Sequence, residues 1–98
     1  MVRPKICRRV LLNPQVKYFK PRGIPLRELK ETILSVEEFE AIRLKDLEGL
    51  EQSECSKKMN VSQPTFHRII CLARKKISDA IINGKAIKIE GGNFKISK

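Results

Sequence analysis

Residues 51–74 read EQSECSKKMNVSQPTFHRIICLAR, and the spacing within this stretch predicts two helices joined by a short turn. Cys55 and Met59 stand four residues apart, which places both on one face of a first helix over about residues 52–59. Asn60 follows, and asparagine is the non-glycine residue that best tolerates a left-handed backbone. The first part of the stretch therefore predicts a short helix that ends in a tight turn.

A longer helix is predicted after the turn. Ser62 suits its N-cap, and Pro64 suits its first turn, where a backbone N–H has no partner within the helix. An apolar stripe with alternating spacings of three and four residues then continues as far as Asn83-Gly84. The residues of the stripe are Phe66, Ile69, Ile70, Ala73, Ile77 and Ile81.

An earlier helix begins at a capping box, Ser35-Val36-Glu37-Glu38. The Ser35 hydroxyl can accept the backbone N–H of Glu38, whose carboxylate reaches back to the start of the helix. Gly49 is expected to end this helix in the left-handed conformation. We expect Val36, Phe39, Ile42 and Leu47 on its buried face, with Glu37, Glu40 and Lys45 outside.

The segments on either side contain proline, glycine and alternating apolar residues. Residues 1–25 hold four of the five prolines and predict a basic arm with at most one short strand, before a single helical turn over residues 26–30. Residues 85–98 alternate around Gly91-Gly92, which predicts a β-hairpin, or one strand with a frayed end, that packs on the helices or pairs with residues 9–12. The expected fold is mainly α: a three-helix domain over residues 26–84, an N-terminal arm and a C-terminal strand or hairpin.

Charge is distributed unevenly along the chain, which carries a formal net charge of +10. Residues 1–30 hold nine basic and one acidic side chain, residues 31–60 four and eight, and residues 61–98 eight and two. An acidic segment thus lies between two basic ones. This pattern favours a polyanionic partner that faces the basic parts, although a solvated surface that maintains solubility would have the same composition.

The sequence offers little chemistry for catalysis or for a metal cage. It has no Gly-rich phosphate loop and no Ser–His–Asp set, so we expect no enzymatic activity, no cofactor and no small-molecule substrate. Cys7, Cys55 and Cys71 include no Cys-x-x-Cys pair and His67 is the single histidine, so we expect buried or half-buried free thiols and no bound metal. No apolar run is long enough to span a membrane, and we expect a cytoplasmic protein without a membrane partner.

Two helices joined by three or four residues, with the second longer and basic, predict a helix-turn-helix. Ser56 is small where the two helices cross, and Val61 with Phe66 fills the space beneath the turn. Four segments also resemble region four of bacterial sigma factors, the part that reads promoters: 34–39 (LSVEEF), 43–50 (RLKDLEGL), 61–68 (VSQPTFHR) and 73–76 (ARKK). Asn60 departs from that pattern, in which a glycine usually forms the turn.

The chain as a whole resembles a family of small uncharacterised prokaryotic basic proteins. This resemblance adds three further segments, Arg3-Pro4-Lys5, residues 18–21 (YFKP) and residues 89–92 (IEGG). It implies binding of double-stranded DNA, with the N-terminal half of the last helix in the major groove, and a role in transcription regulation.

The resemblance assigns roles to individual residues on that helix. Gln63 is expected to read adenine and Arg68 guanine, with contact to DNA favoured for Arg68 over an ion pair with Asp46 or Glu48. His67 either reads a base or shields the edge of the core. The other expected DNA contacts are Ser62, Pro64 and Thr65 near the helix start, Arg74, Lys75 and Lys76 on the backbone, and Arg3, Lys5, Arg8 and Arg9 of the arm.

Two alternatives remain open from the sequence. The arm can instead be a disordered solubilising tail, and the helix-turn-helix can instead serve a protein- or RNA-interaction adaptor. RNA binding favours exposed aromatic residues, and here only Tyr18, Phe19 and Phe94 could serve. Since one helix reads few bases, we expect a homodimer, formed through the C-terminal hairpin or the apolar end of the last helix.

Overall fold

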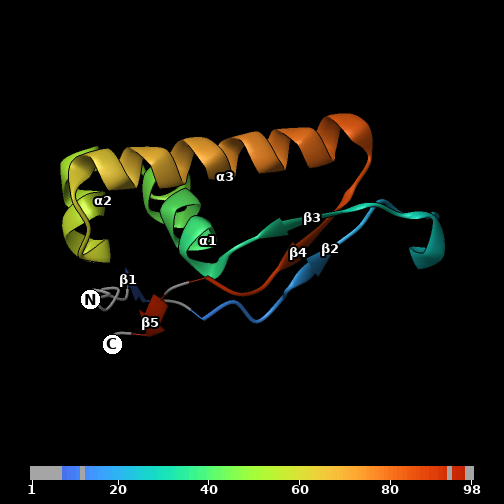
Figure 1. Cartoon of the computed structure of the whole chain (residues 1–98), viewed down its shortest axis with the longest axis horizontal. Helices are drawn as coiled ribbons and strands as arrows, with labels where there is room; N and C mark the ends of the chain where they lie inside the picture. The colour runs from blue at the N-terminus through green and yellow to red at the C-terminus, as the bar shows by residue number, and fades with distance from the viewer. Residues whose placement is uncertain (1–7, 12, 93, 97–98) are drawn as a thin grey trace, which may run out of the picture.

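The long helix α3 (Gln63–Asn83) runs along one side of the molecule, with α1 and the strands below it in Figure 1. A computed structural model describes residues 8–11, 13–92 and 94–96 of the chain. The other helical elements are α1 (Val36–Ile42), a π-helical turn η2 (Arg43–Leu47), α2 (Gln52–Met59) and a 3-10 turn η1 (Leu26–Glu28). None of these helices combines the length and the hydropathy that a membrane span requires.

The helices begin and end where the sequence indicates. Ser35 Oγ accepts the backbone N–H of Glu38, and the Glu38 carboxylate accepts the N–H of Ser35, so the capping box is confirmed. Ser62 caps α3 through a single bond, in which its hydroxyl accepts the backbone N–H of Thr65. Asn60 ends α2 in the left-handed conformation with φ of 58°, and Gly84 ends α3 with φ of 64°. Local backbone chemistry therefore sets all four of these boundaries.

Five short strands form two small sheets. β4 (Ala86–Ile89) lies between β2 (Tyr18–Phe19), which is antiparallel to it, and β3 (Glu31–Leu34), which is parallel to it. β1 (Arg8–Val10) pairs in parallel with β5 (Phe94–Ile96) in a separate two-stranded sheet. Both sheets lie on the same side of α3 in Figure 1.

The apolar core has two parts. Under the turn between α2 and α3 lie Ala41, Leu44, Cys55, Met59, Phe66 and Ile70, all nearly or fully buried. Between α3 and the sheets lie Val10, Leu34, Val36, Ala73 and Ile89. Residues of α1 and α3 contribute to both parts. The sheets therefore pack against the later part of α3, while its first turns and α2 are anchored on α1.

The expected C-terminal hairpin is wrong, because β4 and β5 belong to different sheets. Gly91 accepts the backbone N–H of Val36 at 3.0 Å, and Gly92 has φ of 103° with space for a Cβ only 3.0 Å from Ser35 Cβ. The glycine pair thus carries the chain closely past the start of α1 instead of turning it back. The expected pairing with residues 9–12 is confirmed, since β5 pairs with β1.

The arm contains more structure than the sequence predicts. Two strands, β1 and β2, replace the single strand expected within residues 1–25, and strand β3 was not predicted. Each of these strands is four residues or shorter and depends on a partner far away in the chain. Such short strands leave little periodicity in the sequence, so the sequence pattern does not predict them.

Three expected faces of the helices are also wrong. Glu40 is 2% exposed, and Leu47 is 79% exposed while Leu44 is buried. The π-helical turn bonds Glu48 N–H to Arg43 O, which shifts the chain out of the α-helical register and turns Leu47 to solvent. On α3 the buried stripe ends at Ala80, whereas Ile81 is 71% exposed.

Candidate nucleic-acid interface

The start of α3 presents a polar, exposed face next to the α2–α3 turn. Gln63, Pro64, His67 and Arg68 are exposed, as is the capping residue Ser62, and Thr65 is half-buried. Phe66 and Ile70, on the opposite side of the same turns, are fully buried. The six residues expected near the helix start thus lie together on one surface.

Hydrogen bonds among side chains order this surface. The Ser62 hydroxyl lies 2.9 Å from the Thr65 hydroxyl and accepts the Thr65 backbone N–H at 3.2 Å. Arg68 Nη2 donates to Thr65 Oγ1 at 3.1 Å. Within the described residues Arg68 has no carboxylate partner, and neither Asp46 nor Glu48 contacts it, since both pair with other arginines. Its guanidinium is therefore held in place while its charge remains available.

His67 contacts side chains from both helices of the pair. Its Nδ1 lies 3.4 Å from the amide nitrogen of Gln52 at the start of α2. Its Nε2 lies 3.4 Å from Sγ of Cys71, one turn further along α3. Cys71 is exposed, so the expectation of a buried or half-buried thiol is wrong for it, whereas Cys55 is buried as expected. Cys7 lies outside the described residues.

The basic residues further along α3 divide into two groups. Arg74 donates two hydrogen bonds to Asp46 of the π-helical turn, at 3.0 Å from Nε and 2.6 Å from Nη2. Lys76 Nζ lies 2.8 Å from Oε1 of the buried Glu38. Lys75 is exposed and, among the described residues, makes no ion pair. The protein's own carboxylates therefore engage Arg74 and Lys76, while Lys75 faces solvent.

The Arg74–Asp46 pair affects the titration of both groups. The hydrogen bonds from Arg74 lower the pKa of the Asp46 carboxyl below its usual value, and the same contact raises the pKa of Arg74. Each charged form stabilises the other, so the pair remains ionised across the neutral range.

The structure describes two of the four arm residues that are expected to contact DNA, Arg8 and Arg9. Arg3 and Lys5 lie outside the described residues. Arg8 Nε lies 2.9 Å from Oε2 of Glu37, close enough for an ion pair although the two groups are not aligned for a hydrogen bond. Arg9 is exposed, whereas Arg8 is half-buried. Of these two arginines, Arg9 therefore offers the more accessible charge.

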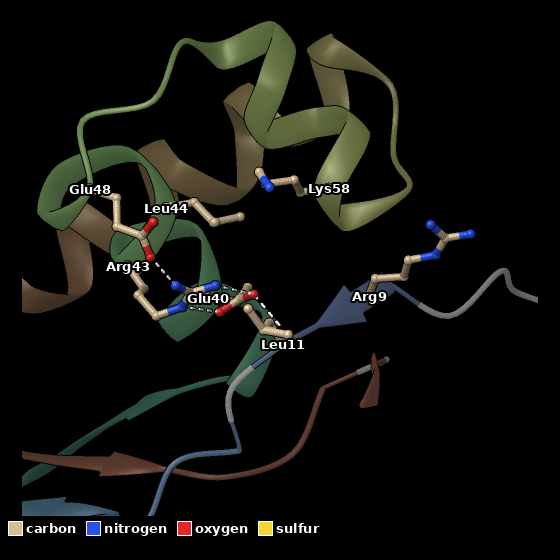
Figure 2. A pocket seen from close by; sticks show the side chains of 7 residues that line it. All are labelled: Arg9, Leu11, Glu40, Arg43, Leu44, Glu48 and Lys58. Carbon is tan, nitrogen blue, oxygen red and sulfur yellow. Dashed lines mark hydrogen bonds and ion pairs between the residues drawn. The ribbon is translucent and has the colours of Figure 1, made fainter. Parts of the chain in front are cut away.

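A pocket of about 320 Å³ lies beside Arg9, between β1, α1 and α2 (Figure 2). At its base Glu40 accepts hydrogen bonds from Arg43 Nε at 2.7 Å, from Arg43 Nη2 at 2.9 Å and from the backbone N–H of Leu11 at 2.9 Å. Arg43 also pairs with Glu48, and the bond to Glu40 is the main cause that raises the pKa of Arg43. The buried carboxylate therefore ties the strand β1 to the helical body.

Two side chains of this region were not singled out in the sequence as partners of the site. Gln52 was read only as the beginning of a helix, and Cys71 as a packed thiol. The four-residue separation of Cys71 from His67 was the available signal, because residues i and i+4 share a helix face. Gln52 gave no such signal, because its contact with His67 depends on the angle between α2 and α3.

These observations define a small, mainly helical protein with three helices and short strands in its described residues. The chain belongs to the family described as Protein of unknown function DUF134, whose model matches residues 1–97. A UPF0251 protein of Caldanaerobacter subterraneus subsp. tengcongensis is 65% identical over 96 residues, which cover 98% of this chain and 81% of the relative. UPF0251 proteins of Pelotomaculum thermopropionicum (60% identical, 98% of this chain and 73% of the relative) and Halothermothrix orenii (58%, 100% and 73%) are similar to it as well. No solved structure matches significantly.

Proposed function

We propose that this protein binds double-stranded DNA sequence-specifically through a helix-turn-helix formed by α2 and α3, and that it acts as a transcription regulator. The observation that carries the proposal is the exposure and the hydrogen bonding of Arg68. It stands on the exposed face of the first turns of α3, a side-chain hydrogen bond orients it, and it has no carboxylate partner among the described residues. An exposed and oriented guanidinium without a carboxylate partner can donate hydrogen bonds to the O6 and N7 atoms of guanine.

The residues around Arg68 supply the other contacts that groove reading requires. Gln63, one turn earlier and exposed, can form the paired hydrogen bonds that select adenine. Ser62 and Thr65 stand at the helix N-terminus, where their hydroxyl groups and the positive end of the helix dipole favour a phosphate. Lys75 adds an unpaired charge for the DNA backbone two turns further along.

The anchoring of α3 supports the same proposal. Phe66 and Ile70 are fully buried beneath the exposed face, and Asn60 fixes the turn before it. A recognition helix must project its polar face from a rigid body, because a misplaced donor loses its base partner. The α2–α3 pair meets this requirement through a buried core that it shares with α1 and the π-helical turn.

The test is a salt-titrated binding series with the full chain. Preferred duplexes are first selected from random DNA, and the affinity for the selected duplex is compared with that for scrambled duplex, RNA of the same sequence and heparin. Sequence-specific binding predicts a preference of about a thousandfold or more for the selected duplex at physiological salt. Equal affinity for duplex and heparin would show polyanion binding alone, and preference for RNA would point to the adaptor function.

We also propose that the DNA-bound form is a homodimer, because one recognition helix reads too few bases for useful specificity. Sedimentation of the protein with and without its selected duplex measures the stoichiometry. Two chains on a site with two half-sites about one DNA turn apart support the proposal. One chain on a site without two-fold symmetry contradicts it.

A further inference from the structure

His67 and Cys71 lie on the same exposed face of α3 with their donor atoms already close together. The distance from His67 Nε2 to Cys71 Sγ is 3.4 Å, whereas Nδ1 of the same ring is 4.0 Å from the sulfur. Imidazole nitrogen and thiolate sulfur are the two side-chain donors that zinc-class ions prefer. The pair therefore combines the right donor types with a defined separation.

The separation matches what one metal ion demands of two ligands. A tetrahedral zinc ion has a Zn–S distance of about 2.3 Å and a Zn–N distance of about 2.0–2.1 Å, which places its sulfur and nitrogen donors about 3.5 Å apart. The observed 3.4 Å agrees with this value. The helix itself sets residues i and i+4 one above the other, so both donors stay on one face when the ring rotates to direct its lone pair at the metal.

Gln52 supplies the outer contact that metal-binding histidines require. A ligating histidine donates its second ring N–H to an oxygen, which fixes the tautomer and the ring orientation. The Gln52 amide lies 3.4 Å from Nδ1, and its oxygen can take the position of the nitrogen by rotation of the amide group. With Nδ1–H donating to that oxygen, Nε2 carries its lone pair toward Cys71.

We propose that His67 Nε2 and Cys71 Sγ form a two-ligand site for a zinc-class metal ion, with water in the remaining coordination positions. Binding breaks the S–H bond of Cys71, releases that proton to the buffer and forms the metal–sulfur and metal–nitrogen bonds. No group of three or more His, Cys, Asp or Glu side chains is placed to hold a metal in the described residues. The site is thus an open two-ligand site, and it departs from the expectation of no bound metal that the cysteine and histidine counts favour.

The test is a titration of the full chain, without DNA, with Zn²⁺ and with Cd²⁺. Calorimetry with Zn²⁺ should show saturable binding that Cys71→Ser and His67→Gln each weaken by at least about tenfold. Cd²⁺ should produce the ultraviolet absorption of a metal–thiolate bond in the wild type and not in Cys71→Ser. Cys7→Ser is the matched control and should leave both signals unchanged.

The controls separate a lost site from a lost fold. Both ligands are exposed, so the circular dichroism of each variant should equal that of the wild type. Zn²⁺ affinity that is unaffected by Cys71→Ser and His67→Gln, or cadmium absorption that persists without Cys71, overturns the proposal. Because no DNA is present, the result is independent of the proposed DNA binding.

Discussion

Arg74 of α3 and Asp46 of the π-helical turn are joined by two parallel hydrogen bonds, at 3.0 and 2.6 Å. The pair closes a contact between segments that stand 28 residues apart. It also engages an arginine that is expected to contact DNA, because the Asp46 carboxylate already binds two of the guanidinium donors and neutralises its charge. Arg74 and Arg68 lie about two turns apart on the same helix, so the effects of their substitution on DNA binding can be compared directly.

Arg68→Ala and Arg74→Ala should affect DNA binding differently. Loss of Arg68 should weaken binding to the selected duplex by about 1–3 kcal/mol and relax specificity at one position. Arg74→Ala should change the discrimination between duplexes little, because Asp46 already engages that side chain. Binding isotherms on the selected duplex and on its single-base variants provide the measurement. Equal losses of specificity in both variants would contradict the assignment of Arg68.

Lys75→Ala provides a third comparison on the same helix. Its exposed ammonium is expected to touch phosphate only, so the substitution should weaken all duplexes by similar factors. The slope of log affinity against log salt should fall by about one unit. A base-specific loss in this variant would mean that another face of α3 enters the groove.

The Arg74–Asp46 pair should contribute to stability only above acid pH. Arg74 lowers the pKa of folded Asp46 below 3.8, so the folded protein binds fewer protons at this group than the unfolded chain. Its stabilisation is therefore complete above the unfolded-state pKa and is lost as the pH falls through the folded-state pKa. Since the two side chains are 46% and 38% exposed, Asp46→Asn should cost only about 0.5 kcal/mol at neutral pH.

Urea unfolding of wild type and Asp46→Asn at neutral and at strongly acid pH measures this contribution. The two proteins should differ at neutral pH and converge in acid. A difference that grows as the pH falls would have the wrong sign for this pair.

Glu40→Ala should be the most destabilising substitution of those considered. The Glu40 side chain is 3% exposed and accepts three hydrogen bonds, so its removal leaves Arg43 with only the exposed Glu48 as a counter-charge and Leu11 with an unpaired N–H. Loss of one partner from a buried ion pair costs about 3–5 kcal/mol. Equilibrium unfolding in urea should show this loss.

Glu48→Ala is the matched control, because Glu48 pairs with the same guanidinium but is 44% exposed. It should cost less than about 1 kcal/mol. Glu40→Gln keeps an acceptor for Leu11 and should fall between the two. If Glu40→Ala and Glu48→Ala were equally stable, the buried carboxylate would have no special role in holding β1.

Asn60 allows a test of the turn between α2 and α3. Its φ of 58° is costly for residues with a Cβ, and asparagine reduces that cost by local hydrogen bonding. Asn60→Ala should therefore lower the unfolding free energy by about 1 kcal/mol, whereas Asn60→Gly should keep or raise it. Thermal unfolding of the two variants decides this, and a greater loss with glycine would contradict the left-handed turn.

The two described thiols should differ sharply in reactivity. Cys71 is exposed, while burial raises the pKa of Cys55 and keeps it from reagents. In a Cys7→Ser background, one thiol should react with a thiol reagent in the folded protein and a second only in denaturant. Rapid reaction of both thiols without denaturant would show that the core beneath α2 opens easily.

Much of the helical part of the fold could be predicted from local patterns. The capping box at Ser35, the left-handed Asn60 and the spacing of Cys55 and Met59 are determined by neighbours within a few residues. Leu47 shows the limit of this reasoning, because a single π-helical turn changes which residue faces the core. Strand β3 shows another limit, because it is stabilised mainly by a pairing with β4 more than fifty residues later.

The candidate site could likewise be predicted only in part. Exposure of Gln63, His67 and Arg68 followed from the helical period, since Phe66 and Ile70 had to face inward. The internal pairing of Arg74 and Lys76 did not follow, because it depends on where α1 and the π-helical turn lie against α3. A sequence can place charges on a helix face, but their partners come from the tertiary fold.

The parallel pairing of β1 with β5 has a consequence for the order of folding. The α1–α2–α3 body is built from contacts close in sequence and can therefore form early. Strand β1 precedes that body in the chain, whereas its partner β5 follows it. Val10, which is buried in the folded protein, should therefore stay accessible to solvent until β1 and β5 pair beside the helical body.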